Sequence, residues 1–245
     1  MGLHKKKPII PIVIILVLLL ILGGGVYVFL SLEGITIPFL NSDDTGPTVE
    51  VKRIYSEIDY NNNGIDDYSD IVKGARIDAE NLPRYDGSFY TKGGYPPDNV
   101  GVCTDLVWRA FKEAGYSLKD MVDKDIALRP KDYKRITEPD PNIDFRRVKN
   151  LRVFFDKYAK SLTTDIKKVD EWQPGDIVIF KNESHIGIIS DKRVRNGRPY
   201  VLHNNAQKTC REEDYLKSRE VGFHYRFISS DVPDSILTSW EDRKR

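Results

Sequence analysis

The sequence contains few cysteines and carries almost no net charge. Its 245 residues include only Cys103 and Cys210, and the formal net charge is +1. Neither cysteine belongs to a C-x-x-C motif, which leaves a cysteine-based zinc site with little support. Basic and aromatic residues form no interleaved stripe of the kind that binds nucleic acids. We therefore expect no nucleic-acid partner, and the chain contains no internal repeat.

Long apolar runs are absent except at the N-terminus, where residues 8–30 are apolar and follow three lysines. About 20 such residues cross the hydrocarbon core of a bilayer. Lysines before the run, with no comparable basic cluster just after it, favour a cytoplasmic N-terminus. We expect residues 1–30 to form a basic end and a transmembrane helix, with the remainder extracytoplasmic in the cell membrane. A cleavable signal peptide is the alternative, but its apolar region usually spans roughly 7–15 residues.

The sequence after the anchor divides into four parts. Proline, glycine and acidic residues interrupt any periodicity in residues 31–50, which we interpret as a tether. Residues 51–70 contain a calcium-like loop, and residues 71–230 are long enough for one well-packed domain. Residues 231–245 form a polar C-terminal end.

The segment DYNNNGIDDYSD matches an EF-hand-type loop, which needs oxygen ligands at fixed positions and glycine at position 6. Gly64 occupies the glycine position. The expected ligands are Asp59, Asn61, Asn63, Ile65 (through its carbonyl), Asp67 and Asp70. The loop resembles the single calcium loops of dockerins. Its last ligand is aspartate instead of glutamate, so we expect modest affinity for a structural Ca²⁺ ion. An acidic turn without a metal is the alternative.

Cys103 stands where a helix is predicted to begin. Apolar residues recur behind it with helical spacing, and Gly115 suits the C-terminal cap. Free backbone N–H groups and the helix dipole in a first turn stabilise a thiolate. The alternative is a small buried residue, a common role for a lone cysteine. A nucleophilic cysteine also requires a base.

Two histidines flank a predicted β-hairpin. The segments DIVIF, HIGIIS and PYVLHN are typical of strands. His185 begins the second strand and His203 ends the third, and both are equally distant from Val194. A symmetric antiparallel hairpin would place them opposite each other on one face. This is the relation between a base and its orienting partner, although a plain cross-strand pair is the alternative. His224 is expected to be a hydrogen-bonded strand residue.

These segments together resemble the motifs of the papain-like cell-wall cysteine peptidases of the NlpC type. The matching segments are YTKGG (90–94), VCTD (102–105), PGDIVIF, HIGII and VLHNN. The chain resembles domain-of-unknown-function family 1287 more closely, through GVCTD, NIDFRRV (142–148) and HYR (224–226). This resemblance covers roughly residues 71–227. It implies an α+β fold in which the nucleophile helix packs on an antiparallel sheet of about five or six strands.

The resemblance also implies roles for individual residues. Cys103 would be the nucleophile, His185 the general base, and His203 the residue that orients His185. Tyr90 would help to bind the oxyanion, together with the backbone N–H of Cys103. The peptidases' D-C-S-G motif is V-C-T-D in this sequence, so substrate specificity cannot be carried over.

Asp144, Arg146 and Arg147 form a dense charged cluster. Arginine binds carboxylates through two parallel hydrogen bonds, so this cluster predicts recognition of a substrate carboxylate. A structural Asp–Arg pair is the alternative.

We therefore expect a membrane-anchored extracytoplasmic cysteine hydrolase that cleaves an amide bond in peptidoglycan stem peptides through an acyl-enzyme, without a catalytic cofactor. One alternative is a catalytically silent cell-wall-binding module on the same fold. Another is an amidase or acyltransferase that acts on a different amide. A zinc hydrolase that uses Cys103, His185 and His203 is the remotest alternative.

Overall fold

The computed structural model describes residues 47–209 and 211–241. The predicted anchor, most of the tether, Cys210 and the last four residues lie outside the described residues. Across the two described ranges, no helix combines the length and apolar character that a membrane span requires.

The main sheet has six strands, and all its neighbouring strands are antiparallel. In spatial order they are β3 (Ala159–Ser161), β8 (Val221–Phe227), β4 (Ile177–Phe180), β5 (Ile186–Arg193), β6 (Pro199–Leu202) and β7 (Glu212–Glu213). A short parallel pair, β1 (Arg84–Tyr85) and β2 (Val100–Gly101), precedes the sheet in sequence. The predicted α+β class and antiparallel sheet are confirmed.

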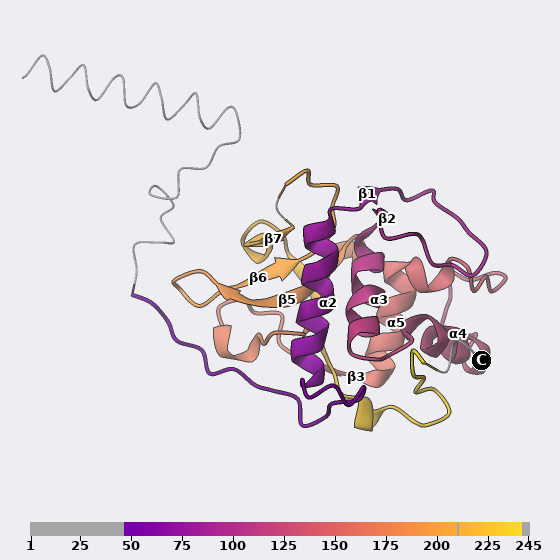
Figure 1. Ribbon diagram of the computed structural model, residues 1–245, viewed down its shortest axis with the longest axis horizontal. Helices are drawn as coiled ribbons and strands as arrows, with labels where there is room; N and C mark the ends of the chain where they lie inside the picture. Colours follow the sequence, from indigo (N-terminus) through magenta and orange to yellow (C-terminus); the bar gives the residue numbers. More distant parts are fainter. Residues whose placement is uncertain (1–46, 210, 242–245) are drawn as a thin grey trace, which may run out of the picture. The chain divides into compact units, whose positions relative to one another are not determined.

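Four α-helices occur in the described residues, namely α2 (Asp67–Asn81), α3 (Cys103–Glu113), α4 (Leu118–Leu128) and α5 (Val148–Tyr158). Figure 1 shows α2 and α3 side by side in front of β5 and β6. Gly74 allows this approach, because a Cβ atom there would lie 2.9 Å from the Cα of Ala110. The helices therefore cover one face of the sheet.

Helix α2 begins earlier than the apolar pattern alone indicates. The side chain of Asp66 accepts a hydrogen bond from the backbone N–H of Ser69 and caps the helix. The first turn therefore lies inside the predicted calcium loop, whose last residue, Asp70, is helical. The helix ends just before Leu82, which has a φ of 49° and precedes Pro83. Ile77 is an apolar residue of this helix that stays 53% exposed.

Apolar side chains cover both faces of the sheet. On the helix side, Ile177 and Ile179 of β4 pack in a core that includes α3 and α5. On the other face, Val178 and Phe180 pack with Trp172 and further apolar residues. Each residue of β4 is buried, so this strand forms the centre of the structure. Burial on two faces explains why its sequence is continuously apolar.

The β5–β6 hairpin is not symmetric about Val194. Ile188 pairs with Leu202, and the register shifts between Ile189 and Arg193. A Cβ atom on Gly187 would lie 3.1 Å from the Cβ of His203, so Gly187 occupies the position opposite this histidine. His185 is therefore a diagonal neighbour on the same face. The predicted direct opposition of the two histidines is wrong, although their predicted proximity is right.

Candidate functional site

The start of α3 is fixed by hydrogen bonds that involve residues on either side of Cys103. The carboxylate of Asp105 accepts the backbone N–H of Val102 at 2.7 Å, which satisfies a donor just before the first turn. Gly101 is needed for close packing, because a Cβ atom there would lie 3.0 Å from Nη1 of Arg109. These contacts hold Cys103 at the first helical position.

Cys103 is a free thiol that is 5% exposed. Burial raises its pKa to about 11 and outweighs the backbone N–H groups of Ile186, Thr104 and Cys103 itself, which lower the pKa. The N–H groups of the helix start thus act in the predicted direction, but burial of the sulfur has the larger effect. The free-energy cost of desolvating a thiolate is larger than the stabilisation that these few N–H groups provide. The resting group is a neutral thiol.

His185 and His203 form a direct hydrogen-bonded pair. Nε2 of His185 lies 2.8 Å from Nδ1 of His203, and the two rings are nearly perpendicular, at 83°. Nε2 of His203 in turn lies 3.1 Å from Oε1 of Glu213. The pair is buried, with exposures of 6% for His185 and 0% for His203. The structure thus adds a carboxylate to the predicted pair of histidines.

The hydrogen-bond partners of His185, His203 and Glu213 determine which ring nitrogens carry protons. A hydrogen bond from His203 lowers the pKa of Glu213 against the effect of burial, so Glu213 is a carboxylate that only accepts. The amide nitrogen of Gln207 lies 3.0 Å from both Nε2 of His203 and Oε1 of Glu213. With Glu213 as its acceptor, Nε2 of His203 donates, which leaves Nδ1 to accept from Nε2–H of His185. The remaining nitrogen of a neutral His185, Nδ1, carries a lone pair. A general base requires such an unprotonated nitrogen.

His185 is neutral in the resting site, because burial and then the neighbouring His203 and Arg219 lower its pKa to about 3. Within the described residues, the thiol of Cys103 makes no direct hydrogen bond to this ring. It instead receives the backbone N–H of Ile186, the residue that follows His185. The start of β5, directly after His185, therefore lies against the thiol of Cys103. Catalytic hydrogen bonds are often long without substrate.

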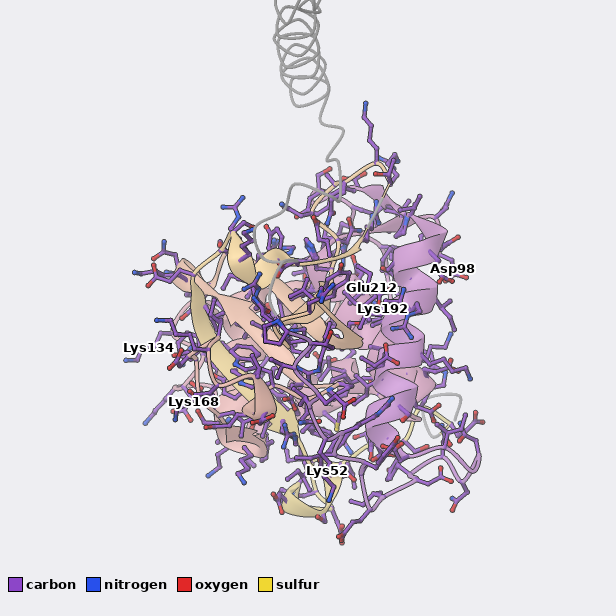
Figure 2. The ribbon with its side chains drawn as sticks, turned by 90° about the vertical axis from the view of Figure 1, so that its left-hand side faces the viewer. Lys52, Asp98, Lys134, Lys168, Lys192 and Glu212 are labelled. Carbon is purple, nitrogen blue, oxygen red and sulfur yellow. The ribbon has the colours of Figure 1, made fainter. Side chains whose placement is uncertain are left out.

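Glu213 is held in place by its neighbour Glu212. Arg76, Ser190 and Lys192 all hydrogen-bond to the carboxylate of Glu212, and Figure 2 shows Lys192 beside it. Burial opposes ionisation of Glu212, but these hydrogen bonds outweigh it and lower its pKa to about 2. This cluster ties β7 to α2 and β5. Because β7 has only two residues, its sequence offered little signal that Glu213 belongs to the site.

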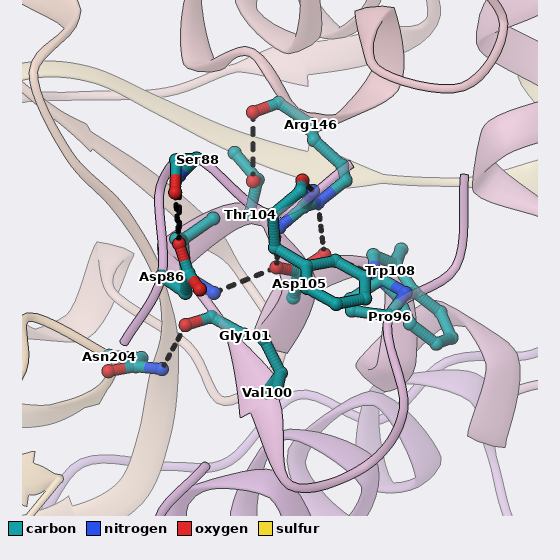
Figure 3. Close-up of polar contacts among 12 residues, drawn as sticks. Asp86, Ser88, Pro96, Val100, Gly101, Thr104, Asp105, Trp108, Arg146 and Asn204 are labelled. Carbon is teal, nitrogen blue, oxygen red and sulfur yellow. Dashed lines mark hydrogen bonds and ion pairs between the residues drawn. The ribbon is translucent and has the colours of Figure 1, made fainter. Parts of the chain in front are cut away.

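One buried amide connects the end of β6 to the segment before α3. Asn204, which follows His203, is 0% exposed, and its Nδ2 donates to the carbonyl of Gly101 at 3.3 Å. Figure 3 shows this bond at the segment that leads into α3. It joins residues that are 103 positions apart. The end of β6 and the start of α3 are thereby held together.

A cavity of about 740 Å³ opens at Cys103. Tyr85, Val102 and Ser184 line it near the thiol, and residues 135–150 supply much of the remaining wall. Its lining includes both basic and acidic side chains. A polypeptide segment with polar and charged groups fits this chemistry better than a purely apolar ligand does.

The structure places Arg146 differently from its expected role. Its Nε and Nη2 each lie 2.8 Å from one carboxylate oxygen of Asp105, and the two side chains are 2% and 0% exposed. Nη1 donates to the carbonyl of Phe89. Arg146 is therefore committed to protein partners, which favours the alternative of a structural Asp–Arg pair over recognition of a substrate carboxylate. Figure 3 shows how this pair connects the VCTD and NIDFRRV motifs.

Of the other two residues in the predicted charged cluster, the side chain of Asp144 has a hydrogen-bond partner and that of Arg147 has none in the described part of the chain. The carboxylate of Asp144 accepts the backbone N–H of Asp140 at 2.7 Å, and burial raises its pKa. Asp144 is therefore engaged in bracing its own loop. Arg147 is exposed at the cavity, and its side chain makes no hydrogen bond or ion pair within the described residues. Of the predicted cluster, Arg147 is the member that is free to meet a ligand.

Tyr90 lies away from the thiol, and a different tyrosine lies near it. The hydroxyl of Tyr90 donates to Asp140 at 3.0 Å, and the residue is 57% exposed. Tyr85 lines the cavity with Cys103, and burial, followed by the charge of Cys103, raises the pKa of Tyr85. The geometry therefore favours Tyr85 over Tyr90 as a residue near the reacting atoms. The YTKGG motif begins at Tyr90 and gave no indication that Tyr85 lies near the thiol.

The predicted calcium loop lies at the opposite end of α3 from Cys103. Asn61 of the loop donates to the carbonyl of Glu113, the last residue of this helix. An 11-residue helix is about 16 Å long, so the loop is remote from the thiol. No group of three or more His, Cys, Asp or Glu side chains in the described part of the chain is placed to hold a metal.

His224 belongs to a separate buried cluster. Its Nδ1 lies 2.8 Å from the carbonyl of Thr163, and its Nε2 lies 2.9 Å from Oδ2 of Asp176. Arg226 also donates to Asp176, and Trp172 stacks on the imidazole with ring centroids 3.9 Å apart. His224 is a hydrogen-bonded strand residue, as expected. Asp176 does more than hold a turn, because it joins β4 to β8.

Comparisons with known proteins agree with the arrangement of motifs. The family model "Domain of unknown function (DUF1287)" matches residues 72–227. The chain is also 35% identical over 167 residues to "Uncharacterized protein YijF" of Escherichia coli (strain K12), which covers 64% of this chain and 80% of the relative. No solved structure matches the chain.

Proposed function

The chain belongs to the DUF1287 family, and from this premise we propose that it is a cysteine hydrolase that cleaves an amide bond in peptidoglycan stem peptides. The observation that carries the proposal is the combination of Cys103 at a helix start with the His185–His203–Glu213 hydrogen-bonded chain beside it. The resemblance to NlpC-type peptidases supports a papain-like core for this domain. It also supports the cell wall as the location of the substrate.

The proposed reaction begins when Sγ of Cys103 attacks the amide carbonyl carbon and its proton passes to Nδ1 of His185. The imidazolium then protonates the leaving nitrogen as the C–N bond breaks, and a thioester remains. Water attacks the thioester carbon while His185 accepts its proton. This proton returns to the thiolate, and the products are an amine and a carboxylic acid.

A neutral resting pair suits this sequence of proton transfers. The thiol keeps its proton until substrate enters, because burial raises the pKa of Cys103. His203 and Glu213 stabilise the positive charge that develops on His185 during attack. The backbone N–H of Cys103 is one donor for the oxyanion, and the hydroxyl of Tyr85 is a further donor.

The cavity supports a substrate that carries carboxylates. Arg147 and Arg135 are exposed on its lining, and neither side chain forms an ion pair within the described residues. Unpaired guanidinium groups bind carboxylates through parallel hydrogen bonds. Stem peptides of peptidoglycan are rich in carboxylates, and an extracytoplasmic domain on a membrane anchor would meet them. The predicted anchor in residues 1–30 supplies this location in the proposal.

The test uses the full chain, purified in a mild non-ionic detergent with calcium present. It is incubated with purified peptidoglycan and with defined stem peptides, and the products are measured by mass spectrometry. We expect fragments that gain one water at an amide bond and that disappear with Cys103→Ala. Equal product from the Cys103→Ala variant, or no product from any wall substrate, would overturn the proposed hydrolase.

Two alternatives predict different results in the same assay. A transfer activity on another amide would give products in which an added amine replaces water, and product mass identifies it. A silent wall-binding module would sediment with peptidoglycan without cleaving it, and Cys103→Ala would bind equally well. Its thiol would also react with iodoacetamide at the same rate in wild type and in His185→Gln.

A further inference from the structure

The loop formed by residues 59–70 has the conformation that an ion-binding loop requires. Asn62 and Gly64 have φ values of 56° and 86°, so the chain reverses sharply at the predicted glycine. A Cβ atom on Gly64 would meet nothing within 4 Å. The glycine is therefore required by backbone conformation and not by packing.

Side-chain oxygens of this loop accept hydrogen bonds from the loop's own backbone N–H groups. The carboxylate of Asp59 accepts the N–H groups of Asn63 and Gly64 at 3.0 and 2.7 Å. Oδ1 of Asn61 and Oδ1 of Asn63 each accept an N–H two residues further on, at 3.0 and 2.8 Å. A carboxylate or amide oxygen has a second lone pair, so each of these atoms can also bind a cation.

The buried carboxylate of Asp70 supplies an independent observation. Asp70 is 1% exposed, and its Oδ1 has no hydrogen-bond partner in the described part of the chain. Its Oδ2 accepts bonds from the amides of Asn61 and Asn63, so the carboxylate is directed into the loop. Lys73, one turn along α2, pairs with Glu113 at 2.6 Å instead. A buried carboxylate oxygen without a donor is unfavourable unless a cation satisfies it.

We propose that this loop binds one Ca²⁺ ion through Asp59, Asn61, Asn63, the carbonyl of Ile65 and Asp70. Asp67, which the sequence pattern included as a ligand, instead uses both carboxylate oxygens on the N–H of Tyr60 and the hydroxyl of Tyr116. It is a positioning residue for the loop. Two carboxylates with neutral amide and carbonyl oxygens suit a hard cation that tolerates irregular geometry, as Ca²⁺ does.

The ion would brace the helix that begins with Cys103. Asn61 bonds to the last residue of α3 at 2.8 Å, and Tyr60 stacks on Tyr116 with centroids 4.3 Å apart. A Cβ atom on Gly115 would lie 2.8 Å from the Cβ of Asn61, so the loop sits tightly on the turn after α3. Calcium in the loop therefore stabilises the α2–α3 pair without touching the reacting atoms.

The experiment measures Ca²⁺ binding and thermal unfolding of the full chain in detergent, after treatment with a chelator. We expect one site with a Kd on the order of 10⁻⁴–10⁻³ M. At a free Ca²⁺ concentration of about ten times this Kd, Tm should rise by roughly 3–5 °C. MgCl₂ at equal concentration should have a much smaller effect, because Mg²⁺ demands stricter octahedral geometry. No calcium-dependent shift at millimolar concentration would overturn the proposal.

Three variants separate a built site from general binding of cations. Asp70→Asn keeps the shape of the side chain and should abolish the calcium response without lowering Tm in chelator. Asn63→Asp adds charge at an exposed ligand position and should tighten binding several-fold. Asp98→Asn is the matched control (Figure 2 labels Asp98), since only the backbone carbonyl of Asp98 accepts the side-chain amide of Asn81 at the far end of α2. Undiminished calcium binding in Asp70→Asn would overturn the proposed site, whatever the outcome of the hydrolase assay.

Discussion

His185 and His224 are both buried near the same sheet, but they differ in whether a ring nitrogen is available to accept a proton. Both ring nitrogens of His224 face acceptors, the carbonyl of Thr163 and the carboxylate of Asp176. His185 uses Nε2 on His203, and its other nitrogen makes no hydrogen bond within the described residues. A buried histidine can act as a base only if a lone pair remains available to a proton. The difference between these residues is therefore the free nitrogen, since both are buried and both are hydrogen-bonded.

The largest expected effect is on kcat of the proposed hydrolysis. His185→Gln should lower kcat by about 10²–10⁴-fold, because the general base is lost. Its Tm should remain within a few degrees of wild type. His224→Gln is the matched control and should lower Tm, since it disturbs the buried Asp176 cluster. Its folded fraction should retain kcat within about tenfold of wild type. An equal loss of kcat in both variants would contradict the proposal that His185, and not His224, is the general base.

A smaller effect is expected at Glu213, which touches His203 and acts through it. Glu213→Gln should lower kcat by about 10–100-fold with little change in KM, as replacement of an orienting carboxylate does. The charge that develops on His185 would lose part of its stabilisation. Glu220→Gln, on an exposed pair with Lys181, is the control for a change of charge. An unchanged pH–rate profile and kcat in Glu213→Gln would show that the carboxylate only supports structure.

The smallest expected effect, counted for a change of one pH unit, is on the folding equilibrium in acid. The pKa of His185 is about 3 in the folded protein, below its ordinary value of 6.5. Below pH 6.5 the unfolded chain therefore binds a proton that the folded chain does not, and stability falls as the pH decreases toward 3. The contribution is at most about tenfold in the folding equilibrium per pH unit. Urea unfolding of wild type and His185→Gln between pH 4 and 7 measures it, and identical slopes would contradict it.

Features that depend on local periodicity were predictable from the sequence. The helix start at Cys103 and the three strands around the histidines follow from short patterns of apolar and turn residues. The proximity of His185 and His203 also follows, because strands alternate with a period of two. Their diagonal placement does not, because a register shift between Ile189 and Arg193 changes the pairing.

Features that depend on tertiary burial were not predictable. The pKa of Cys103 rises because the sheet covers the thiol, and the helix start alone indicated the opposite direction. The sequence predicted that Arg146 binds a ligand, but this residue pairs with Asp105, which is 41 positions away. Glu213 lies on a two-residue strand that is positioned by its neighbour's ion pairs. No local pattern encodes such long-range partners.

The hydrogen bond between Asn204 and Gly101 has a consequence for the biosynthesis of this protein. Helix α3 and the segment before it are synthesised about a hundred residues before the end of β6 that bonds to this segment. A nascent chain that stops before residue 213 would contain Cys103 but lack the complete histidine and carboxylate chain. The order of residues along the polypeptide thus delays assembly of the site until synthesis of the domain is nearly complete. The proposed wall-cleaving activity would accordingly be silent during translation and begin only after the finished domain folds.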